Sequence, residues 1–377
     1  PPPPPSFQAE DGIRDSVNGL VGSEMCIRDS SAFHLDTRYR LVLTYRGLDV
    51  IRGSMLVPPG RMMVFDPRDD GLTLVEITKE QVQPGIRMDF GAPPAVKRRP
   101  GESSIEAEGE AADASSYSVI DLLVLHTPSL EDPVDTIEHM VETGNIAFRD
   151  SDVAAEFRLV HVMEVDYPDS NDSETTTRAM QRNDPPFEDL EAMRDEFGAD
   201  LVLMVRPLDW NAHGNCGWAF ILGGNGGNVD QPRWAYGSVS EGTDDVANRY
   251  CADSILAHEA GHLMGSAHDL EHQTLAGAYS YSNGYGFDGL YGTVMSYYFP
   301  SVARFSSPRI SCDGIEPCGI PAGEAGEADN ARSLEQTRST VANFRSTSVP
   351  FQVESGLWGI DAELVTGEPG RGFQLVY

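Results

Sequence analysis

The run HEAGHLMGSAHD, from His258 to Asp269, constrains this chain more than any other part of its sequence. On an α-helix, His258 and His262 stand at positions i and i+4, so both imidazoles project from one face toward a common point. Glycine adopts a positive φ at low cost, so Gly265 allows the chain to leave the helix and turn. We expect this turn to bring His268 beside the other two histidines.

Three histidines at one point predict a catalytic zinc site. Three protein ligands leave the fourth position of a tetrahedral Zn²⁺ open for water, whereas structural zinc sites are closed by four ligands. A bound zinc ion lowers the pKa of that water toward about 7 and polarises a carbonyl group. Glu259 stands one step round the helix, where it could take the proton of the water and pass it to a leaving amine. The sequence therefore predicts one zinc ion and the hydrolysis of peptide bonds.

Three other classes of protein would need different residues around this motif. In a non-catalytic, zinc-stabilised adhesion or binding module the metal site would be structural and would need no general base, yet Glu259 is present. A zinc peptidase with a distant glutamate as third ligand would not need His268 at this spacing. A serine hydrolase would have a GxSxG motif after a strand, and no predicted strand is followed by one. The binding module stays the alternative to an endopeptidase.

The composition argues against two classes of partner. The mean hydropathy is -0.31, and no run approaches the roughly 18 consecutive apolar residues of a membrane helix. The net charge of -32 opposes phosphate binding, which needs a basic surface. We therefore expect a soluble protein with no membrane span and no nucleic-acid partner, acting on proteins or peptides.

The chain divides into five segments. Residues 1–30 contain QAEDGIRD and LVGSEMCIRDS, which resemble translated sequencing adapter, so we expect this segment not to belong to the protein and the native start, with any signal peptide, to be missing. Residues 31–96 show short alternating runs typical of β-hairpins. Residues 97–116 are charged and small, as in a linker. Residues 117–345 form the main domain, and residues 346–377 resemble the start of a truncated β module.

The main domain alternates strand-like and helical patterns, which predicts an α/β fold. Two short runs in its Gly-rich middle, CGWAFIL and RWAYGSV, could offer a sheet edge to an extended peptide. We expect strands at SVIDLLVLHT, at 156–165, at ADLVLMV and in those two runs, and helices at 133–150, at FEDLEAMRDEFG and at 331–345.

The cysteines indicate an exported protein. With Cys26 of the first segment left out, four remain, and an even number fits two disulfides in a secreted chain. Four cysteines allow three pairings. We favour Cys216 with Cys251, which would tie the Gly-rich segment to the histidine helix, and Cys312 with Cys318, which would close a small loop.

A second motif, GTVMSYY, places Met295 27 residues after His268. A histidine motif of this kind followed by a methionine turn resembles the metzincin zinc peptidases. Asp269, directly after the third histidine, is similar to the reprolysin (adamalysin) branch. The runs IDLLVLHTPS, ADLVLMVRP, NCGWA and VANFR resemble bacterial reprolysin-like peptidases, including the peptidyl-Asp metallopeptidases. The resemblance covers about residues 117–345.

This resemblance implies a mixed five-stranded sheet, a histidine helix at the floor of a cleft and a smaller subdomain with Met295 beneath the metal. It implies that Asp269 supports the histidine turn and that residues around Gly292–Val302 shape the S1′ pocket. Tyr297 has the spacing of a tyrosine that approaches the metal or the oxyanion in astacin- and serralysin-like enzymes. Animal reprolysins lack it, so both a catalytic and a packing role stay open.

The resemblance also implies a zymogen in which residues 31–96 are a propeptide that inhibits the enzyme. Animal reprolysin prodomains block the zinc with a cysteine, but residues 31–116 contain no cysteine. We expect another ligand, for example an acidic residue such as Asp69 or Asp70.

Overall fold

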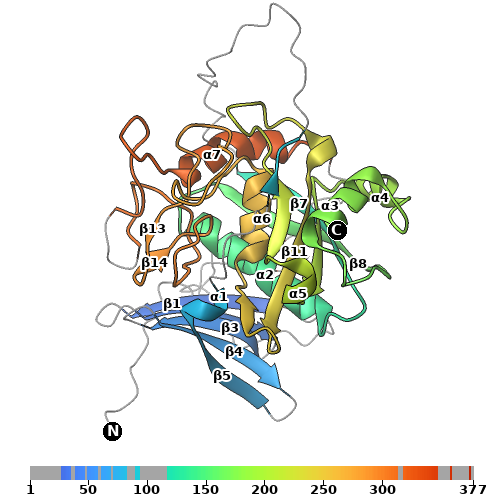
Figure 1. The fold of residues 1–377 in the computed structure, drawn as a ribbon, viewed down its shortest axis with the longest axis horizontal. Coiled ribbons are helices and arrows are strands. Elements are labelled where there is room, and N and C mark those ends of the chain that lie inside the picture. Colours follow the sequence, from blue (N-terminus) through green and yellow to red (C-terminus); the bar gives the residue numbers. More distant parts are fainter. Residues whose placement is uncertain are drawn as a thin grey trace, which may run out of the picture.

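The computed structural model describes the chain in several stretches: residues 27–34, 39–46, 49–57, 61–68, 71–82, 90–93, 117–312, 317–346, 357–358 and 373–374. Two large sheets lie in these stretches, and helices cover both faces of the second sheet (Figure 1). No helix in the described part of the chain is long and apolar enough to cross a membrane.

The N-terminal part of the structure is an antiparallel sheet in which each strand pairs with the next along the chain. This arrangement agrees with the β-hairpins predicted for residues 31–96. The first strand begins at Ile27, so it includes the end of the segment that resembles adapter sequence. The elements are β1 (Ile27–His34), β2 (Tyr39–Arg46), β3 (Asp49–Val57), β4 (Arg61–Arg68), β5 (Gly71–Ile77) and the short helix α1 (Lys79–Val82).

A mixed sheet forms the centre of the main domain. Strands β8, β7, β9 and β11 lie in this spatial order and run parallel, and β10 is antiparallel to β11. Each of them overlaps a run that the sequence predicts as a strand, and β11 continues five residues beyond its run, which ends at Val239. Their bounds are β7 (Ser118–His126), β8 (Ala155–Glu164), β9 (Leu201–Pro207), β10 (Gly217–Phe220) and β11 (Tyr236–Asp244).

The mixed sheet has seven strands, so the expected number of five is too low. The additional strands are β12 (Arg249–Cys251), which pairs with the end of β11, and β6 (Phe90–Gly91), which pairs with β10. Strands of two or three residues are too short to show a period in the sequence. Strand β6 also comes from the N-terminal region, which no local pattern could reveal.

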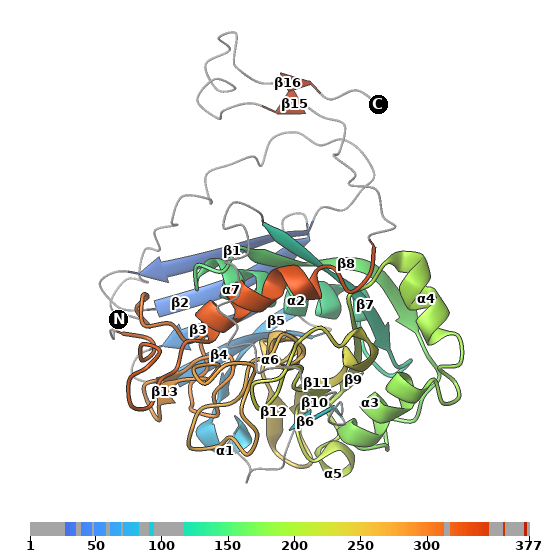
Figure 2. The ribbon, with the colours of Figure 1, turned by 90° about the horizontal axis from the view of Figure 1, so that it is seen from above.

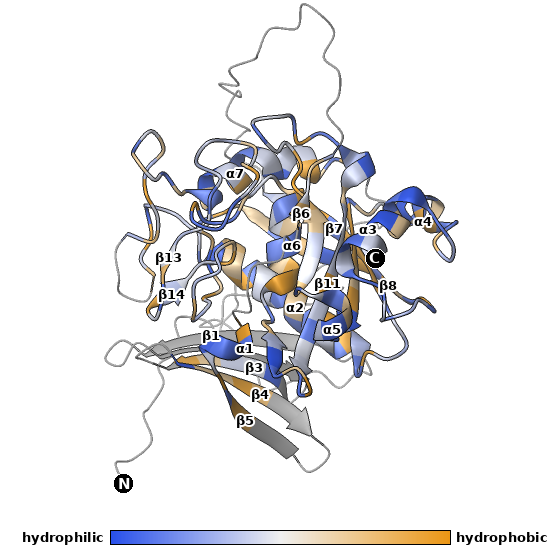
Figure 3. Cartoon of the chain, in the orientation of Figure 1, coloured by the Kyte–Doolittle hydropathy of each residue, from blue (hydrophilic) through white to orange (hydrophobic). Residues whose placement is uncertain are grey.

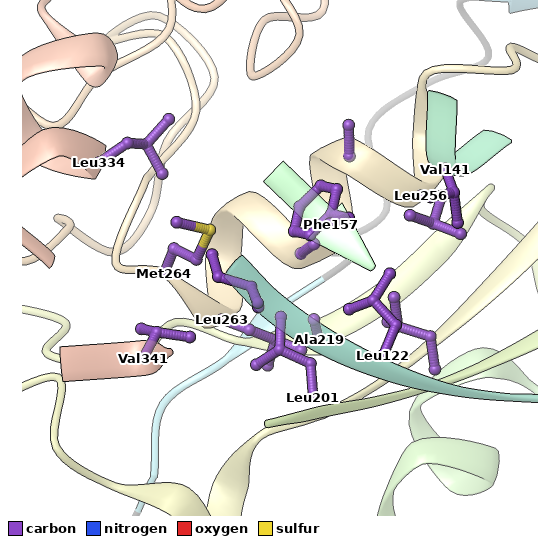
Figure 4. Close-up of a cluster of buried hydrophobic side chains, with 14 of the residues drawn as sticks. Leu122, Val141, Phe157, Leu201, Ala219, Leu256, Leu263, Met264, Leu334 and Val341 are labelled. Atoms are coloured by element: carbon purple, nitrogen blue, oxygen red, sulfur yellow. The ribbon is translucent and has the colours of Figure 1, made fainter. Parts of the chain in front are cut away.

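Hydrophobic cores lie on both faces of this sheet. Leu122 and Val124 of β7 belong to the first core, and Leu123 and Leu125 of the same strand belong to the second. Successive side chains of a strand point to opposite faces, so a strand covered on both sides is apolar throughout. Figure 4 shows part of the first core, where Leu256 and Leu263 pack near Leu122 and Leu201. The helices on the first core are α2 (Pro133–Arg149), α6 (Ile255–Leu263) and α7 (Asn330–Val341).

The second core is covered by α3 (Ser173–Arg182) and α4 (Leu190–Phe197). Helix α4 presents a largely hydrophilic surface outward (Figure 3). Helix α3 is absent from our expectations because its sequence, SETTTRAMQR, is polar and rich in β-branched threonine. Its start does carry a signal, since the Asp172 side chain accepts a hydrogen bond from the Thr175 N–H and caps the helix.

After α6 the chain forms mainly loops. They contain the small hairpin of β13 (Gly286–Phe287) and β14 (Tyr291–Gly292), and α7 closes the domain on the same side as α2 (Figure 2). Two further short elements, α5 (Trp210–His213) and the 3₁₀ turn Pro232–Trp234, lie between the strands. In the tail, β15 (Leu357–Trp358) pairs with β16 (Phe373–Gln374). The linker 97–116 and residues 1–26 lie outside the described residues.

Candidate metal centre

Helix α6 places two of the predicted ligands one turn apart. The imidazole rings of His258 and His262 have centroids 4.8 Å from each other. The helix ends at Leu263, and Gly265 follows with φ +93°, a conformation that side chains with a Cβ rarely adopt. A Cβ at this position would also lie 2.8 Å from the Ala278 side chain. Gly265 therefore permits the turn that the sequence predicts.

The turn brings His268 to the helix. Its Nε2 lies 3.0 Å from Nε2 of His258 and 3.1 Å from Nε2 of His262. All three side chains are buried. Within the described residues, these three histidines form a group that could hold a metal ion, because their possible ligand atoms all lie within 4.8 Å of one another.

Backbone carbonyls orient two of these rings. The Nδ1 of His258 lies 2.6 Å from the carbonyl oxygen of Val294, and the Nδ1 of His262 lies 2.9 Å from that of Ser266. A carbonyl oxygen only accepts, so each Nδ1 carries the proton and donates it. The Nε2 lone pairs are thereby left for a metal, in the arrangement that protein metal sites use.

The donor set fits a zinc ion. Zinc binds imidazole nitrogens at about 2.0–2.1 Å in a tetrahedral arrangement, which places ligand nitrogens about 3.3 Å apart. The Nε2 separations of 3.0 and 3.1 Å are close to this value. Three imidazoles and no fourth protein ligand in the group are typical of a catalytic zinc site.

Glu259 lies against strand β10. Its side chain is fully buried, and a Cβ built on Gly217 would lie 2.4 Å from its Oε1. Any side chain at position 217 would therefore occupy the place of the carboxylate. Sequence reasoning missed Gly217, because this contact joins a strand and a helix that lie about 40 residues apart and leaves no local pattern.

Asp269 connects the histidine turn to the loop that contains the methionine. Its Oδ2 accepts a hydrogen bond from the Tyr297 N–H at 3.1 Å, and its Oδ1 lies 2.6 Å from Nδ1 of His272. The Tyr297 ring packs on His268, with centroids 4.4 Å apart. His272 therefore also belongs to the surroundings of the candidate metal centre.

Met295 lies beneath the histidine helix. It is fully buried, and a Cβ on Gly261 would come within 2.6 Å of its Sδ. The turn around it is closed by a bond from the Ser296 N–H to the Thr293 carbonyl, 2.8 Å long. The preceding residue, Val294, supplies the carbonyl that orients His258. The methionine turn thus both supports α6 and positions a histidine.

The segment expected to shape the S1′ pocket continues from this turn. Its backbone closes on itself through bonds from the Gly292 N–H to the Pro300 carbonyl, at 2.7 Å, and from the Val302 N–H to the Gly292 carbonyl, at 2.8 Å. Because Val294 within it contacts His258, the segment lies directly beside the metal centre.

Both favoured disulfides are formed in the structure. Cys216 pairs with Cys251, which connects the start of β10 to β12 just before α6. Cys312 pairs with Cys318 in the loops after the histidine helix. The first bond therefore holds the strand beside Glu259 to the segment that leads into the histidine helix.

One residue from the N-terminal region also reaches the metal centre. The ring centroid of Phe90 lies 4.9 Å from that of His268 and 5.5 Å from that of His262. Sequence reasoning did not identify Phe90. Asp69 and Asp70, which the sequence analysis gave as examples of an inhibitory ligand, lie outside the described residues.

Comparison with known proteins identifies the family. The family model described as metallo-peptidase family M12B, reprolysin-like, matches residues 123–323, more than half of the chain. A peptidyl-Asp metalloendopeptidase from Pseudomonas aeruginosa is 29% identical over 67% of this chain and 44% of its own length. Another from Xanthomonas campestris pv. campestris is 23% identical over 87% of this chain and 78% of its own.

The chain thus spans less than half of the length of the Pseudomonas relative. Among solved structures, metalloproteinase-II from Bacteroides fragilis covers 85% of this chain and 89% of its own, at 11% identity and a TM-score of 0.37. The match to the family model includes α6, all three histidines and Met295. The chain belongs to the reprolysin-like metallo-peptidase family M12B.

Proposed function

We propose that this protein is a secreted zinc endopeptidase whose metal is held by His258, His262 and His268. The observation that carries the proposal is the convergence of three buried Nε2 atoms, 3.0 and 3.1 Å apart, on a helix that also carries Glu259. Two disulfides support an oxidising, extracellular environment. The names of the relatives support peptides as substrates.

The metal and the side chains of the protein would supply different parts of the mechanism. A zinc ion at this site would polarise the scissile carbonyl and increase the acidity of the attacking water. The oxygen of that water bonds to the carbonyl carbon, and Glu259 accepts one proton from the water at the same time. Glu259 then donates the proton to the amide nitrogen, so the C–N bond breaks with an amine as leaving group. Strand β10 offers its backbone to an extended peptide, which would hold the scissile bond beside the histidines.

Supporting roles follow from the contacts around the ligands. We propose that Asp269 holds the histidine turn and that Met295 supports the helix from below, through the contacts described above. The ring of Tyr297 packs on His268, which supports a positioning role for this tyrosine. We further propose that residues 31–96 act as a propeptide on residues 117–345 of the same chain.

Glu259→Gln tests the mechanism because it keeps the size of the side chain and removes its basicity. We would introduce a specific protease site into residues 97–116, cut the chain there and assay casein hydrolysis at high dilution, where a noncovalently bound N-terminal fragment dissociates. We expect one zinc per chain in both proteins, and hydrolysis at least about 100-fold slower in the variant. Glu188→Gln, on the exposed surface, is the matched control.

Removal of zinc with a chelator should abolish hydrolysis by the cut chain that keeps Glu259, and added zinc should restore it. The cleavage sites in casein, identified by mass spectrometry, would then define the specificity. A folded chain with one bound zinc and no hydrolysis under these conditions would contradict the proposal and favour the non-catalytic binding module.

A further inference from the structure

Strand β6 occupies the outer edge of the mixed sheet beside the metal centre. Phe90 pairs with Ala219 and Gly91 pairs with Phe220, in parallel orientation. The Ile221 N–H extends this pairing with a bond of 2.9 Å to the Gly91 carbonyl. Figure 2 shows β6 beside β10, and the opposite edge of β10 is paired with β11. A peptide that adds to β10 therefore has to use the edge that β6 holds.

The Phe90 side chain is buried among apolar residues next to the candidate ligands, and the space that it fills is called the Phe90 pocket below. Phe90 is 6% exposed and forms a buried cluster with Ile221 and Ala267, against which Leu275 packs. The rings of His262 and His268 form the remaining wall, with centroids 5.5 and 4.9 Å away. The pocket is thus formed by residues that follow β10 and by the histidine turn, and it contains an aromatic ring.

The residue after Phe90 has no room for a side chain. A Cβ on Gly91 would lie 2.5 Å from the Trp218 indole and 3.7 Å from the Arg178 guanidinium. The backbone of β6 therefore lies directly on Trp218. A bulky residue followed by a glycine matches the buried contacts of Phe90 and the close approach of the next residue to Trp218.

The rest of the N-terminal region fastens β6 to the main domain. Met62, Val64 and Ile77 form a hydrophobic cluster with Tyr250 and Phe299 of the main domain. Ion pairs also cross this contact, namely Arg52 with Glu241 and Lys79 with Asp288, and the Arg249 guanidinium donates to the Glu80 carbonyl at 2.9 Å. Such anchoring keeps the local concentration of β6 at the cleft high, so weak contacts of a two-residue strand suffice to hold it there.

We propose that the pocket of Ile221, Ala267 and Leu275 is an aromatic-binding subsite of the peptide cleft, and that Phe90–Gly91 occupies it as a built-in competitor of substrates. The inference rests on the proposed function, since it concerns the same cleft. The uncut chain is restrained by an aromatic ring and a backbone ladder rather than by a cysteine on the metal. Once β6 has left, the pocket accepts a large apolar or aromatic side chain of a peptide that lies on β10.

The first test uses the full, uncut chain. Phe90→Ala should raise peptide hydrolysis about 10-fold to 100-fold, because the burial of one phenylalanine ring no longer favours the closed form. Phe90→Leu, which keeps an apolar side chain, should have a smaller effect. Gly91→Ala should also activate, since its Cβ would collide with Trp218. Leu74→Ala, on the exposed surface of the N-terminal sheet, is the control and should leave the rate unchanged.

A second measurement does not depend on activity. We would follow the rate at which a chelator removes zinc from the uncut chain, because Phe90 covers two of the three histidines. This rate should rise in Phe90→Ala and in Gly91→Ala and stay unchanged in Leu74→Ala. Thermal unfolding of each variant would verify that the main domain is still folded.

A third experiment tests the pocket with a free peptide. A synthetic peptide of residues 88–93 should inhibit the diluted, cut chain, and the same peptide with alanine in place of Phe90 should inhibit at least about tenfold less. Equal inhibition by the two peptides, or unchanged hydrolysis and zinc release in Phe90→Ala, would overturn the inference. The proposed function would survive that result as long as the cut chain still hydrolysed casein in a zinc-dependent manner.

Discussion

The carboxylate of Asp269 accepts a hydrogen bond from the backbone N–H of Tyr297, with 3.1 Å between Oδ2 and N. This bond joins the turn that carries the third histidine to the turn that carries the methionine. The two segments are 28 residues apart, and each contributes to the same metal centre. The bond from Tyr297 to Asp269 therefore connects the segment of His268 with the segment of Val294, whose carbonyl oxygen lies 2.6 Å from Nδ1 of His258.

Asp269→Ala should weaken zinc binding. Loss of the carboxylate leaves the half-buried Tyr297 N–H without this acceptor and frees the histidine turn, and the loss of such an outer partner typically costs 10-fold to 100-fold in metal affinity. Asp269→Asn should have a milder effect, because its amide oxygen can still accept from the Tyr297 N–H. Competition with a coloured chelator would measure the affinity, with Asp245→Ala on the exposed surface as control. Unchanged affinity in Asp269→Ala would show that the turn holds without this bond.

Gly217→Ala should reduce catalysis without removing zinc. The added Cβ would lie 2.4 Å from Oε1 of Glu259, so the carboxylate has to move. A displacement of about 1 Å can lower the rate about 100-fold. The kcat of the diluted, cut chain and its zinc content would be measured together. Gly227→Ala is the matched control, because a Cβ there meets its neighbours at 3.4 Å or more. If kcat falls equally in both variants, the proposed contact does not explain the loss.

The two disulfides should differ in what they contribute to stability. Cys216 and Cys251 are separated by 35 residues, whereas Cys312 and Cys318 are separated by 6. A longer closed loop loses more entropy in the unfolded chain, which predicts a stabilisation of about 4 kcal/mol for the first bond and about 2 kcal/mol for the second. Urea unfolding of the two double Cys→Ser variants would measure these differences. A larger loss for the six-residue loop would contradict this entropic argument.

His213 should make the protein less stable in acid. Burial, followed by the positive charge of Arg206, lowers the pKa of its imidazole to about 4. Its Nε2 donates to the Asp169 carbonyl at 2.7 Å, and its Nδ1 lies 2.8 Å from the Ser240 hydroxyl. The unfolded chain takes up this proton near pH 6.5, whereas the folded chain does so only near pH 4. The stabilisation is therefore complete above pH 6.5 and is lost as the pH falls toward 4.

The size of this effect can be measured by substitution. Between pH 7.5 and pH 5, His213 should account for a loss of about 2 kcal/mol in the free energy of unfolding. His213→Gln, which does not titrate, should show a correspondingly flatter pH dependence in urea unfolding, and His161→Gln on the outer strand β8 serves as control. Parallel pH dependences of His213→Gln and the unmodified chain would rule out this residue as the source.

Much of the main domain could be predicted because its signals are local. The nearly continuous apolar run of β7 indicates a strand covered on both faces, and the structure places its side chains in two different cores. The spacing of His258 and His262 already requires a shared helix face, and Gly265 supplies the turn. Helix α3 was missed because its buried face consists mainly of serine, threonine and alanine rather than large apolar side chains, and such a helix is stabilised by the sheet on which it packs.

The sequence by itself determined the three histidines, the glutamate between them, the methionine turn and the four paired cysteines, because side-chain chemistry and short spacings carry this information. Only the tertiary structure decided which cysteines join, that Gly217 makes room for Glu259, and that Phe90 lies on the histidines. These relationships connect residues far apart in the chain. They depend on the shapes that two surfaces adopt after folding, and no periodicity within either segment encodes them.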